Sequence, residues 1–188
     1  MPPTDEEKDD LLLSCRYGDI DDVREFTLKY GQDSLASIRD DNGNCVLHMV
    51  SGNGHIDVLD YLLPLVPSSL LSTQNNAGST PLHWAALNSH LEVVQKIVQF
   101  PDGPGSELID IKNAAGRSPL TEAEMAGWEE GAKWLVQHMS ISDSVENEET
   151  VDMVEDETAG QSGHAIEVEI QDADGQIAKM KIGEDTKT

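Results

Sequence analysis

The chain has 188 residues, of which 36 are Asp or Glu and 12 are Lys or Arg, so its formal net charge at pH 7 is −24. A field of this sign repels nucleic-acid backbones and anionic lipid and attracts basic proteins, so we expect neither nucleic acid nor a membrane as a direct partner. No run approaches the roughly 20 apolar residues of a membrane helix, and the acidic N-terminus is unlike a signal peptide, so we expect a soluble intracellular protein, of the cytoplasm and nucleus. The high net charge favours a monomer.

The first predicted elements are an acidic lead-in, residues 1–9, and a helical hairpin that follows it. Apolar residues recur at helical spacing on both sides of Gly18, where a left-handed residue would end the first helix. The residues that carry this pattern are Leu11, Ser14, Cys15, Val23 and Phe26. No glycine turn precedes this hairpin, as expected for the terminal cap of a repeat array.

Three further helical hairpins follow, and each opens with a turn glycine. These glycines, at positions 43, 78 and 116, are 35 and 38 residues apart. The clearest unit reads GSTPLHWAA over residues 78–86. Pro81 and Pro119 suit the first turn of a helix, where their missing N–H is not needed, and the preceding Thr80 and Ser118 can cap that turn. The apolar spacing then predicts an inner and an outer helix in each unit.

This pattern resembles the ankyrin repeat, whose period is about 33 residues. The resemblance implies an all-α solenoid of four helix-turn-helix repeats over residues 10–139, the first of them a cap, with short β-turn fingers. In this frame Gly18, Gly54 and Gly127 end the inner helices with a left-handed residue. Ser89 departs from the pattern and predicts local strain in the third repeat.

The fourth repeat departs furthest from the frame. Its unusual residues are Thr121 and Trp128, where repeats two and three carry histidines, and Gly131 at a packing position. We therefore expect the last repeat to be the least stable. Segment 100–106, which precedes this repeat, is rich in Pro and Gly and is predicted to be a solvent-exposed loop.

Residues 140–188 form an acidic tail. Between residues 140 and 157 the tail has eight acids and no Lys or Arg, a composition that predicts disorder. Within residues 165–182, apolar and charged residues alternate on both sides of Asp174-Gly175, which predicts a β-hairpin. An isolated two-stranded hairpin is marginal in water, so we expect it to need the repeats or a partner to persist.

No residue pattern in the chain predicts an enzyme, a cofactor site or a metal site. The sequence has no GxSxG, P-loop, HExxH or dinucleotide-binding glycine motif. Cys15 and Cys45 lack CxxC spacing, so neither a disulfide framework nor a zinc site is expected. The ankyrin frame implies a structural role for His48 and His83, in which local hydrogen bonds hold the finger and the adjacent turn.

A binding surface is therefore the expected functional site. Ankyrin geometry implies a concave groove, lined by exposed positions of the inner helices and by the fingers. The inner-helix positions are Met49, Asn53, Trp84, Leu87, Asn88, Glu122 and Met125, and the finger positions are Asp40, Asp41, Asn42, Asn75, Asn76, Asn113 and Arg117. Met49, Trp84, Leu87 and Met125 predict an apolar strip of the kind that anchors an interface. The alternative is that Trp84 only packs against the next repeat.

The whole layout, with LHWAALN in the third repeat and an acidic tail, resembles a fungal ankyrin-repeat chaperone dedicated to the KH-domain ribosomal protein of the small subunit. The resemblance implies capture of a newly made basic ribosomal protein, protection from aggregation and escort during ribosome biogenesis. The negative net charge of the chain is consistent with this role, because a basic client without its RNA requires counter-charge. The alternative is a regulatory ankyrin adaptor that masks a transcription factor or kinase.

Overall fold

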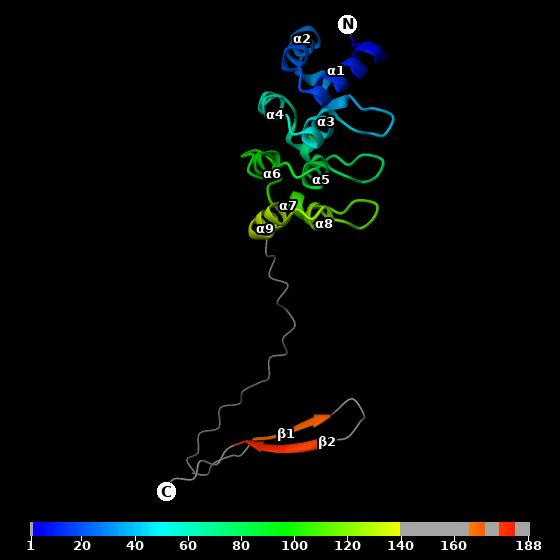
Figure 1. Cartoon of the computed structure of the whole chain (residues 1–188). Helices are drawn as coiled ribbons and strands as arrows, with labels where there is room; N and C mark the ends of the chain where they lie inside the picture. Colours follow the sequence, from blue (N-terminus) through cyan, green and yellow to red (C-terminus); the bar gives the residue numbers. More distant parts are fainter. Residues whose placement is uncertain (1, 140–165, 172–176, 183–188) are drawn as a thin grey trace, which may run out of the picture. The chain divides into compact units, whose positions relative to one another are not determined.

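The structure is a computed structural model that describes residues 2–139, 166–171 and 177–182. It divides into two compact units, residues 1–144 and 145–188, and each is considered by itself. In the first unit the inner helices are α1 (Asp5–Tyr17), α3 (Val46–Asn53), α5 (Pro81–Leu87) and α8 (Pro119–Met125), and the outer helices are α2 (Ile20–Tyr30), α4 (Ile56–Leu62), α6 (Leu91–Val98) and α9 (Glu129–His138). Figure 1 shows the inner helices stacked in one column and the outer helices in a second. The predicted solenoid of four helix pairs is confirmed.

One apolar core runs through all four repeats. Inner helices contact one another in order, α1 with α3, α3 with α5 and α5 with α8. The outer helices cover this column, and the stripe predicted for α6 is buried in full: Val93, Val94, Ile97 and Val98. No single repeat can bury both of its helix faces, so the core exists only because the repeats stack.

Short helices connect each outer helix to the next finger. They are the 3₁₀ helices η1 (Gln32–Ser37) and η2 (Ser68–Ser72) and the short helix α7 (Glu107–Asp110). Residues 100–106 are exposed or half-buried, as predicted for a loop. The sequence analysis missed α7 and its buried Leu108 and Ile109, because one helical turn shows too little periodicity to be recognised.

Helix α1 begins earlier than the repeat boundary placed at residue 10. Thr4 caps it, since the Glu7 N–H donates to Thr4 Oγ1 at 3.3 Å and the Thr4 N–H donates to Glu7 Oε2 at 2.8 Å. This reciprocal capping fixes the first helical residue at Asp5. Residues 5–9 of the acidic lead-in are therefore the first turns of α1 and not a separate segment.

The inner helices end at the expected left-handed residues. Gly18, Gly54 and Gly127 have φ angles of 79°, 77° and 71°, and Ser89 is the one non-glycine residue with positive φ, at 61°, among the described residues. Next to each of these residues a backbone N–H donates five residues back along the chain. The four acceptor carbonyls belong to Ser14, Val50, Ala85 and Ala123, which are therefore equivalent positions in the four repeats.

The second unit contains a two-stranded antiparallel sheet. Strand β1 (Ile166–Gln171) pairs with β2 (Ile177–Ile182), with Ile166 opposite Ile182 and Gln171 opposite Ile177. The predicted strands are thus present. The Asp174-Gly175 turn and the disorder predicted for residues 140–157 lie outside the described residues.

Candidate partner-binding groove

Three fingers project beside the inner helices, before α3, α5 and α8 (Figure 1). In each finger one side-chain oxygen, of Asp40, Asn75 or Asn113, accepts two backbone N–H bonds of 2.7–3.0 Å. The donors are Asn42 and Asn44, Ala77 and Ser79, and Ala115 and Arg117. These three oxygens hold the turns, so Asp40, Asn75 and Asn113 have a structural role, and their contact with a partner stays a prediction.

Neighbouring fingers are joined to one another. The Asn76 N–H donates to the Asn42 carbonyl at 2.9 Å, and the Ala114 N–H donates to the Ala77 carbonyl at 2.9 Å. Gly78 is required at this approach, because a Cβ there would lie 2.7 Å from the Ala114 nitrogen. The fingers therefore form one linked wall. Its exposed residues include three of those predicted for the groove: Asp41, Asn42 and Asn76.

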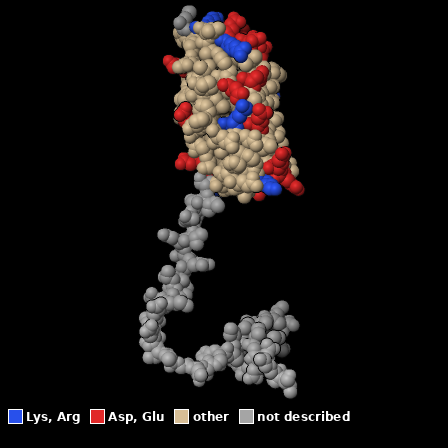
Figure 2. All heavy atoms as spheres, turned by 90° about the vertical axis from the view of Figure 1, so that its left-hand side faces the viewer, with Lys and Arg blue, Asp and Glu red and all other residues tan. Residues whose placement is uncertain are grey.

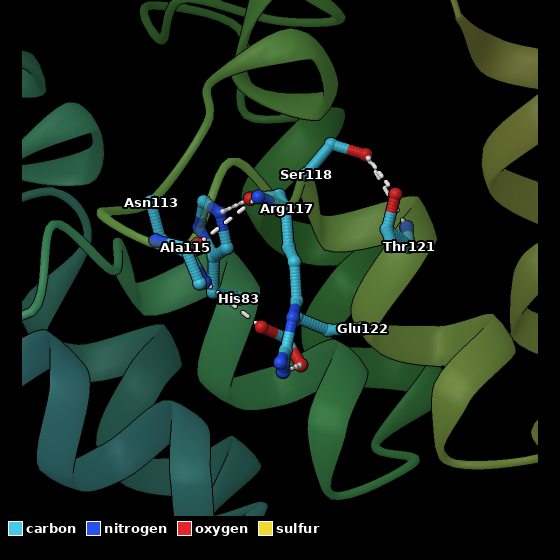
Figure 3. Close-up of polar contacts among 7 residues, drawn as sticks. All are labelled: His83, Asn113, Ala115, Arg117, Ser118, Thr121 and Glu122. Atoms are coloured by element: carbon cyan, nitrogen blue, oxygen red, sulfur yellow. Dashed lines mark hydrogen bonds and ion pairs between the residues drawn. The ribbon is translucent and has the colours of Figure 1, made fainter.

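His48 and His83 connect each inner helix to the finger of the following repeat. His48 Nε2 donates to the Ser79 carbonyl at 2.8 Å, and His83 Nε2 donates to the Arg117 carbonyl at 3.0 Å (Figure 3). Each Nδ1 accepts the N–H of the helix-capping residue, Cys45 or Thr80. A carbonyl can only accept, so both rings carry hydrogen on Nε2 and are neutral.

Burial lowers the pKa of both rings. The pKa of His48 falls from 6.5 to about 4, and that of His83 is also lowered, in each case mainly through desolvation. Neutral, fully bonded and buried side chains of this kind hold structure together and are not exposed to a substrate. The structural interpretation of the two histidines is confirmed.

A second pair of histidines bonds backward. His55 Nε2 donates to the Arg16 carbonyl at 2.9 Å, and His90 Nε2 donates to the Gly52 carbonyl at 3.2 Å. Each bond ties the start of an outer helix to the inner helix of the preceding repeat. Trp128 occupies this position in the fourth repeat, and within residues 2–139 its indole forms no corresponding bond to the preceding inner helix.

Trp84 lies on the floor of the candidate groove. Its ring packs back onto the second repeat, edge-on to His48 with 5.6 Å between centroids, and so close to Gly52 that a Cβ there would lie 2.6 Å from the indole. The side chain is half-buried, and its other side lines an open pocket of about 500 Å³. The remaining lining residues are Asn42, Asn44, Asn75, Asn76, Ala77 and Ser79. Trp84 thus packs against the preceding repeat and still presents surface.

Two of the predicted groove residues are buried. Met49 is 9% exposed and belongs to the apolar core, as suits a flexible apolar side chain that can follow the core surface. Glu122 is 7% exposed, and its Oε1 accepts a 2.8 Å bond from Asn113 Nδ2. Arg117 Nη1 lies 3.7 Å from Glu122 Oε2, so the buried carboxylate is compensated (Figure 3). The predicted exposure of Met49 and Glu122 is therefore wrong.

The other predicted inner-helix residues are exposed. Leu87 and Met125 are 49% and 61% exposed, and Asn53 and Asn88 each donate a side-chain N–H to a carbonyl of their own helix. The apolar strip thus consists of Trp84, Leu87 and Met125, without Met49.

The sequence analysis also missed two exposed apolar residues of the first repeat. Leu13 and Tyr17 are 47% and 74% exposed. The carbonyl equivalence described above gives Leu13 the position of Trp84 and Tyr17 the position of Asn88. This signal was present in the sequence, because Gly18 aligns the first repeat with the others.

Acidic side chains outnumber basic ones among the charged residues of the first unit. Residues 1–139 hold 22 acids and nine Lys or Arg, and on the face of the outer helices acidic side chains outnumber basic ones (Figure 2). Within the described residues no group of three or more His, Cys, Asp or Glu is arranged to hold a metal ion. None of the helices in the described part is long and apolar enough to cross a membrane.

Comparison with known proteins agrees with this architecture. Residues 11–108 match the family described as ankyrin repeats in three copies. The chain belongs to the ankyrin-repeat family. It is 45% identical over 56 residues to an ankyrin repeat-containing protein of Schizosaccharomyces pombe, which covers 30% of this chain and 37% of that protein. It is 31% identical over 64 residues to the ankyrin repeat-containing protein Yar1 of Saccharomyces cerevisiae, which covers 33% of this chain and 32% of that protein.

A solved structure is similar over a longer stretch. The crystal structure of the yeast ribosomal protein Rps3 in complex with its chaperone Yar1 contains a chain that matches with a TM-score of 0.67 at 27% identity. The match covers 72% of this ankyrin-repeat protein and 95% of that chain. The alignments to the two curated relatives span only about a third of the length of each.

Proposed function

We propose that this ankyrin-repeat protein is a non-enzymatic binding module that acts as a dedicated chaperone of a basic small-subunit ribosomal protein in the cytoplasm and nucleus. The observation that carries the proposal is the likeness to a chain of the Rps3–Yar1 complex, whose length is covered to 95%. In this role the chain captures the newly made client and escorts it toward ribosome assembly.

The groove supports a binding role because several of its side chains remain accessible after the structural hydrogen bonds are made. His48 and His83 are neutral, buried and bonded, and the oxygens of Asp40, Asn75 and Asn113 are occupied within the fingers. The accessible surface consists of an apolar strip, Trp84, Leu87 and Met125, beside a polar finger wall. A rigid aromatic anchor next to hydrogen-bonding groups is typical of protein interfaces.

Charge supports the choice of a basic client. The formal net charge is −24, and 22 of the 36 acids lie within residues 1–139. Opposite charge steers a basic protein toward the groove and raises the association rate, while the shaped groove determines how long the complex lasts.

A pull-down from yeast extract tests the proposal against the adaptor alternative. The full-length chain is compared with Trp84→Ala and with Leu28→Ala, a control that removes an apolar side chain 87% exposed on outer helix α2. We expect the parent and the control to recover one small-subunit ribosomal protein in stoichiometric yield, and Trp84→Ala to recover much less. Recovery of a kinase or transcription factor in its place would establish the adaptor.

A further inference from the structure

The free end of the solenoid carries an open furrow that we call the cap face. It is a pocket of about 330 Å³ lined by Asp10, Leu13, Ser14, Tyr17, Asp19 and Asp22. Four of these residues belong to α1 at spacing i, i+3, i+4 and i+7, which places them on one face of that helix. The other two come from the N-terminal end of α2. Helices α1 and α2 lie at the end of the stack (Figure 1).

This face of α1 is unpartnered because no repeat precedes it in the described part of the chain. The equivalents of Ser14 in the later repeats are Val50, Ala85 and Ala123, and all three are fully buried. They are buried where each inner helix packs against its neighbours in the stack. Within residues 2–139 the first repeat also has no finger before its inner helix, so no described residue of this unit covers α1 from that side.

The cap face is more apolar than a terminal cap requires. Terminal repeats need a polar outer face for solubility, yet Leu13 is 47% exposed and Tyr17 is 74% exposed. Leu13 is the equivalent of Trp84 two repeats earlier in the inner-helix column, and the equivalent residue of the repeat between them, Met49, is buried. An exposed Tyr beside a Leu, at the end of this column, has the composition of an interface anchor.

The carboxylates of the cap face lack counter-charges of their own. Asp10, Asp19 and Asp22 form no ion pair within residues 2–139, where the nearby lysines are already paired. Lys8 Nζ lies 2.8 Å from Asp5, and Lys29 Nζ lies 2.9 Å from Glu7.

The negative surface extends beyond this pocket. A second pocket of about 210 Å³ between α1 and α2 shares Asp10, Ser14 and Asp22 with the first, and its other charged lining residues are Glu25 and the ion pair of Glu7 with Lys29. Glu25 likewise forms no ion pair within residues 2–139. The furrow between α1 and α2 is therefore a negative surface with an apolar edge.

We propose that the cap face docks a basic segment of the client, as a second contact beyond the groove at Trp84. Leu13 and Tyr17 would cover apolar side chains or the aliphatic stems of Lys and Arg, and the carboxylates would pair with their cations. A second copy of this chain is a poor occupant, because the same carboxylates would face each other across a symmetric contact. The identity of the client rests on the proposed function, whereas the chemistry of the docked segment does not.

Two probes separate the cap face from the proposed function. Purified yeast Rps3 is titrated into the full-length chain, and an amphipathic helical peptide of lysine and leucine is titrated separately, with backbone amide NMR shifts as the readout. The variants are Tyr17→Ala and the pair Asp10→Asn with Asp22→Asn. Their controls are Leu28→Ala, which removes one exposed apolar side chain, and the pair Glu92→Gln with Asp102→Asn, which neutralises two exposed carboxylates; none of these three residues lines the cap face.

We expect the peptide to shift the amides of α1 and the start of α2, and Tyr17→Ala to raise the Kd for Rps3 about tenfold. The carboxylate pair is expected to slow association at low salt, and both controls to behave as the parent. If both cap-face variants bind Rps3 as the parent does, the proposal that the cap face docks the client is overturned, and the proposed function stands. If the peptide shifts the amides of α1 but Rps3 does not bind, the proposed function alone is overturned. If neither probe shifts these amides, or if the chain dimerises through α1, the proposal that the cap face docks a basic segment is overturned.

Discussion

At the scale of single residues, the junction between repeats three and four differs from the earlier junctions at three positions that depend on one another. At the preceding junction the His90 ring lies against Gly54, where a Cβ would come within 2.7 Å of it. Ser89 has a Cβ, so a histidine ring in the same place would collide with it. Trp128 instead lies over Gly131, where a Cβ would come within 2.1 Å of the indole. Ser89, Trp128 and Gly131 are thus mutually dependent, and Ser89 retains a φ of 61°.

Ser89→Gly should raise the free energy of unfolding by about 1 kcal/mol, because glycine adopts the left-handed conformation without a Cβ penalty. Gly127→Ser makes the reverse exchange at a φ of 71°, with no heavy atom within 4 Å of the added Cβ. It should lower stability by a similar amount. Urea unfolding measures both, and equal midpoints for Ser89→Gly and the parent would show that Ser89 is unstrained.

Protonation of His48 should couple stability to pH. Its pKa is lowered from 6.5 to about 4 by burial, so the unfolded chain takes up this proton first as the pH falls. The stability contributed by neutral His48 is complete above pH 6.5 and is lost as the pH falls toward 4, on the order of 3 kcal/mol. His83 shifts in the same direction.

Acidic groups titrate near the lower end of this range, so the informative quantity is the difference between the parent and His48→Asn. We expect His48→Asn to be less stable than the parent at pH 7 and to lose less stability on going to pH 4.5. Parallel stability curves for the two proteins would contradict the assignment of a neutral, buried His48.

At the scale of elements, two series of histidine hydrogen bonds connect neighbouring repeats, which we call the forward and the backward ladder. The fourth repeat takes part in only the forward one. The forward ladder joins α3 and α5 to the next finger, and the backward ladder joins α4 and α6 to the preceding inner helix. Helix α9, whose N-cap is Trp128, has no such bond in the described part of the chain. Stacking with a neighbour is also one-sided for α8 and α9 in this part.

Hydrogen exchange should therefore find the fourth repeat least protected. We expect amides of α9 to exchange at least about tenfold faster than those of α5 and α6, a difference near 1.4 kcal/mol in opening free energy. A single exchange rate across α3 to α9 would mean that the solenoid opens as one unit and would contradict this expectation.

The elements could be predicted from sequence because their signals are local. Glycine turns, Pro at the first helical residue and apolar spacing place the helices of all four repeats. The start of α1 was placed too late because the apolar spacing begins only at Leu11, although Thr4 and Glu7 have the spacing of a capping box. Exposure at the groove was predicted less well: Met49 and Glu122 fit exposed frame positions, but packing and the Asn113 and Arg117 contacts bury them.

At the scale of the whole molecule, the negative charge is divided between the repeats, residues 1–139, and residues 140–188. Residues 140–188 hold 14 acids and three lysines, and residues 1–139 hold 22 acids and nine Lys or Arg. The two segments thus carry net charges of −11 and −13. Only the repeats present a fixed groove, so specificity and attraction need not come from the same segment.

Truncation after Met139 should slow association with a basic client more than it speeds dissociation, because it removes long-range attraction without altering the groove. Stopped-flow and dissociation measurements with Rps3 give both rate constants. A large rise in the dissociation rate with unchanged association would instead assign a second specific contact to the hairpin of β1 and β2, through strand addition.

The most direct test of the central claim is a calorimetric titration of the full-length chain with purified yeast Rps3, for the parent, Trp84→Ala and the control Leu28→Ala. The account predicts a one-to-one complex for the parent and the control. It predicts a loss of about 2 kcal/mol, or roughly thirtyfold in Kd, for Trp84→Ala, with the fold retained. Absence of a complex with the parent, or equal affinities for all three proteins, would contradict a chaperone that captures its client through this groove.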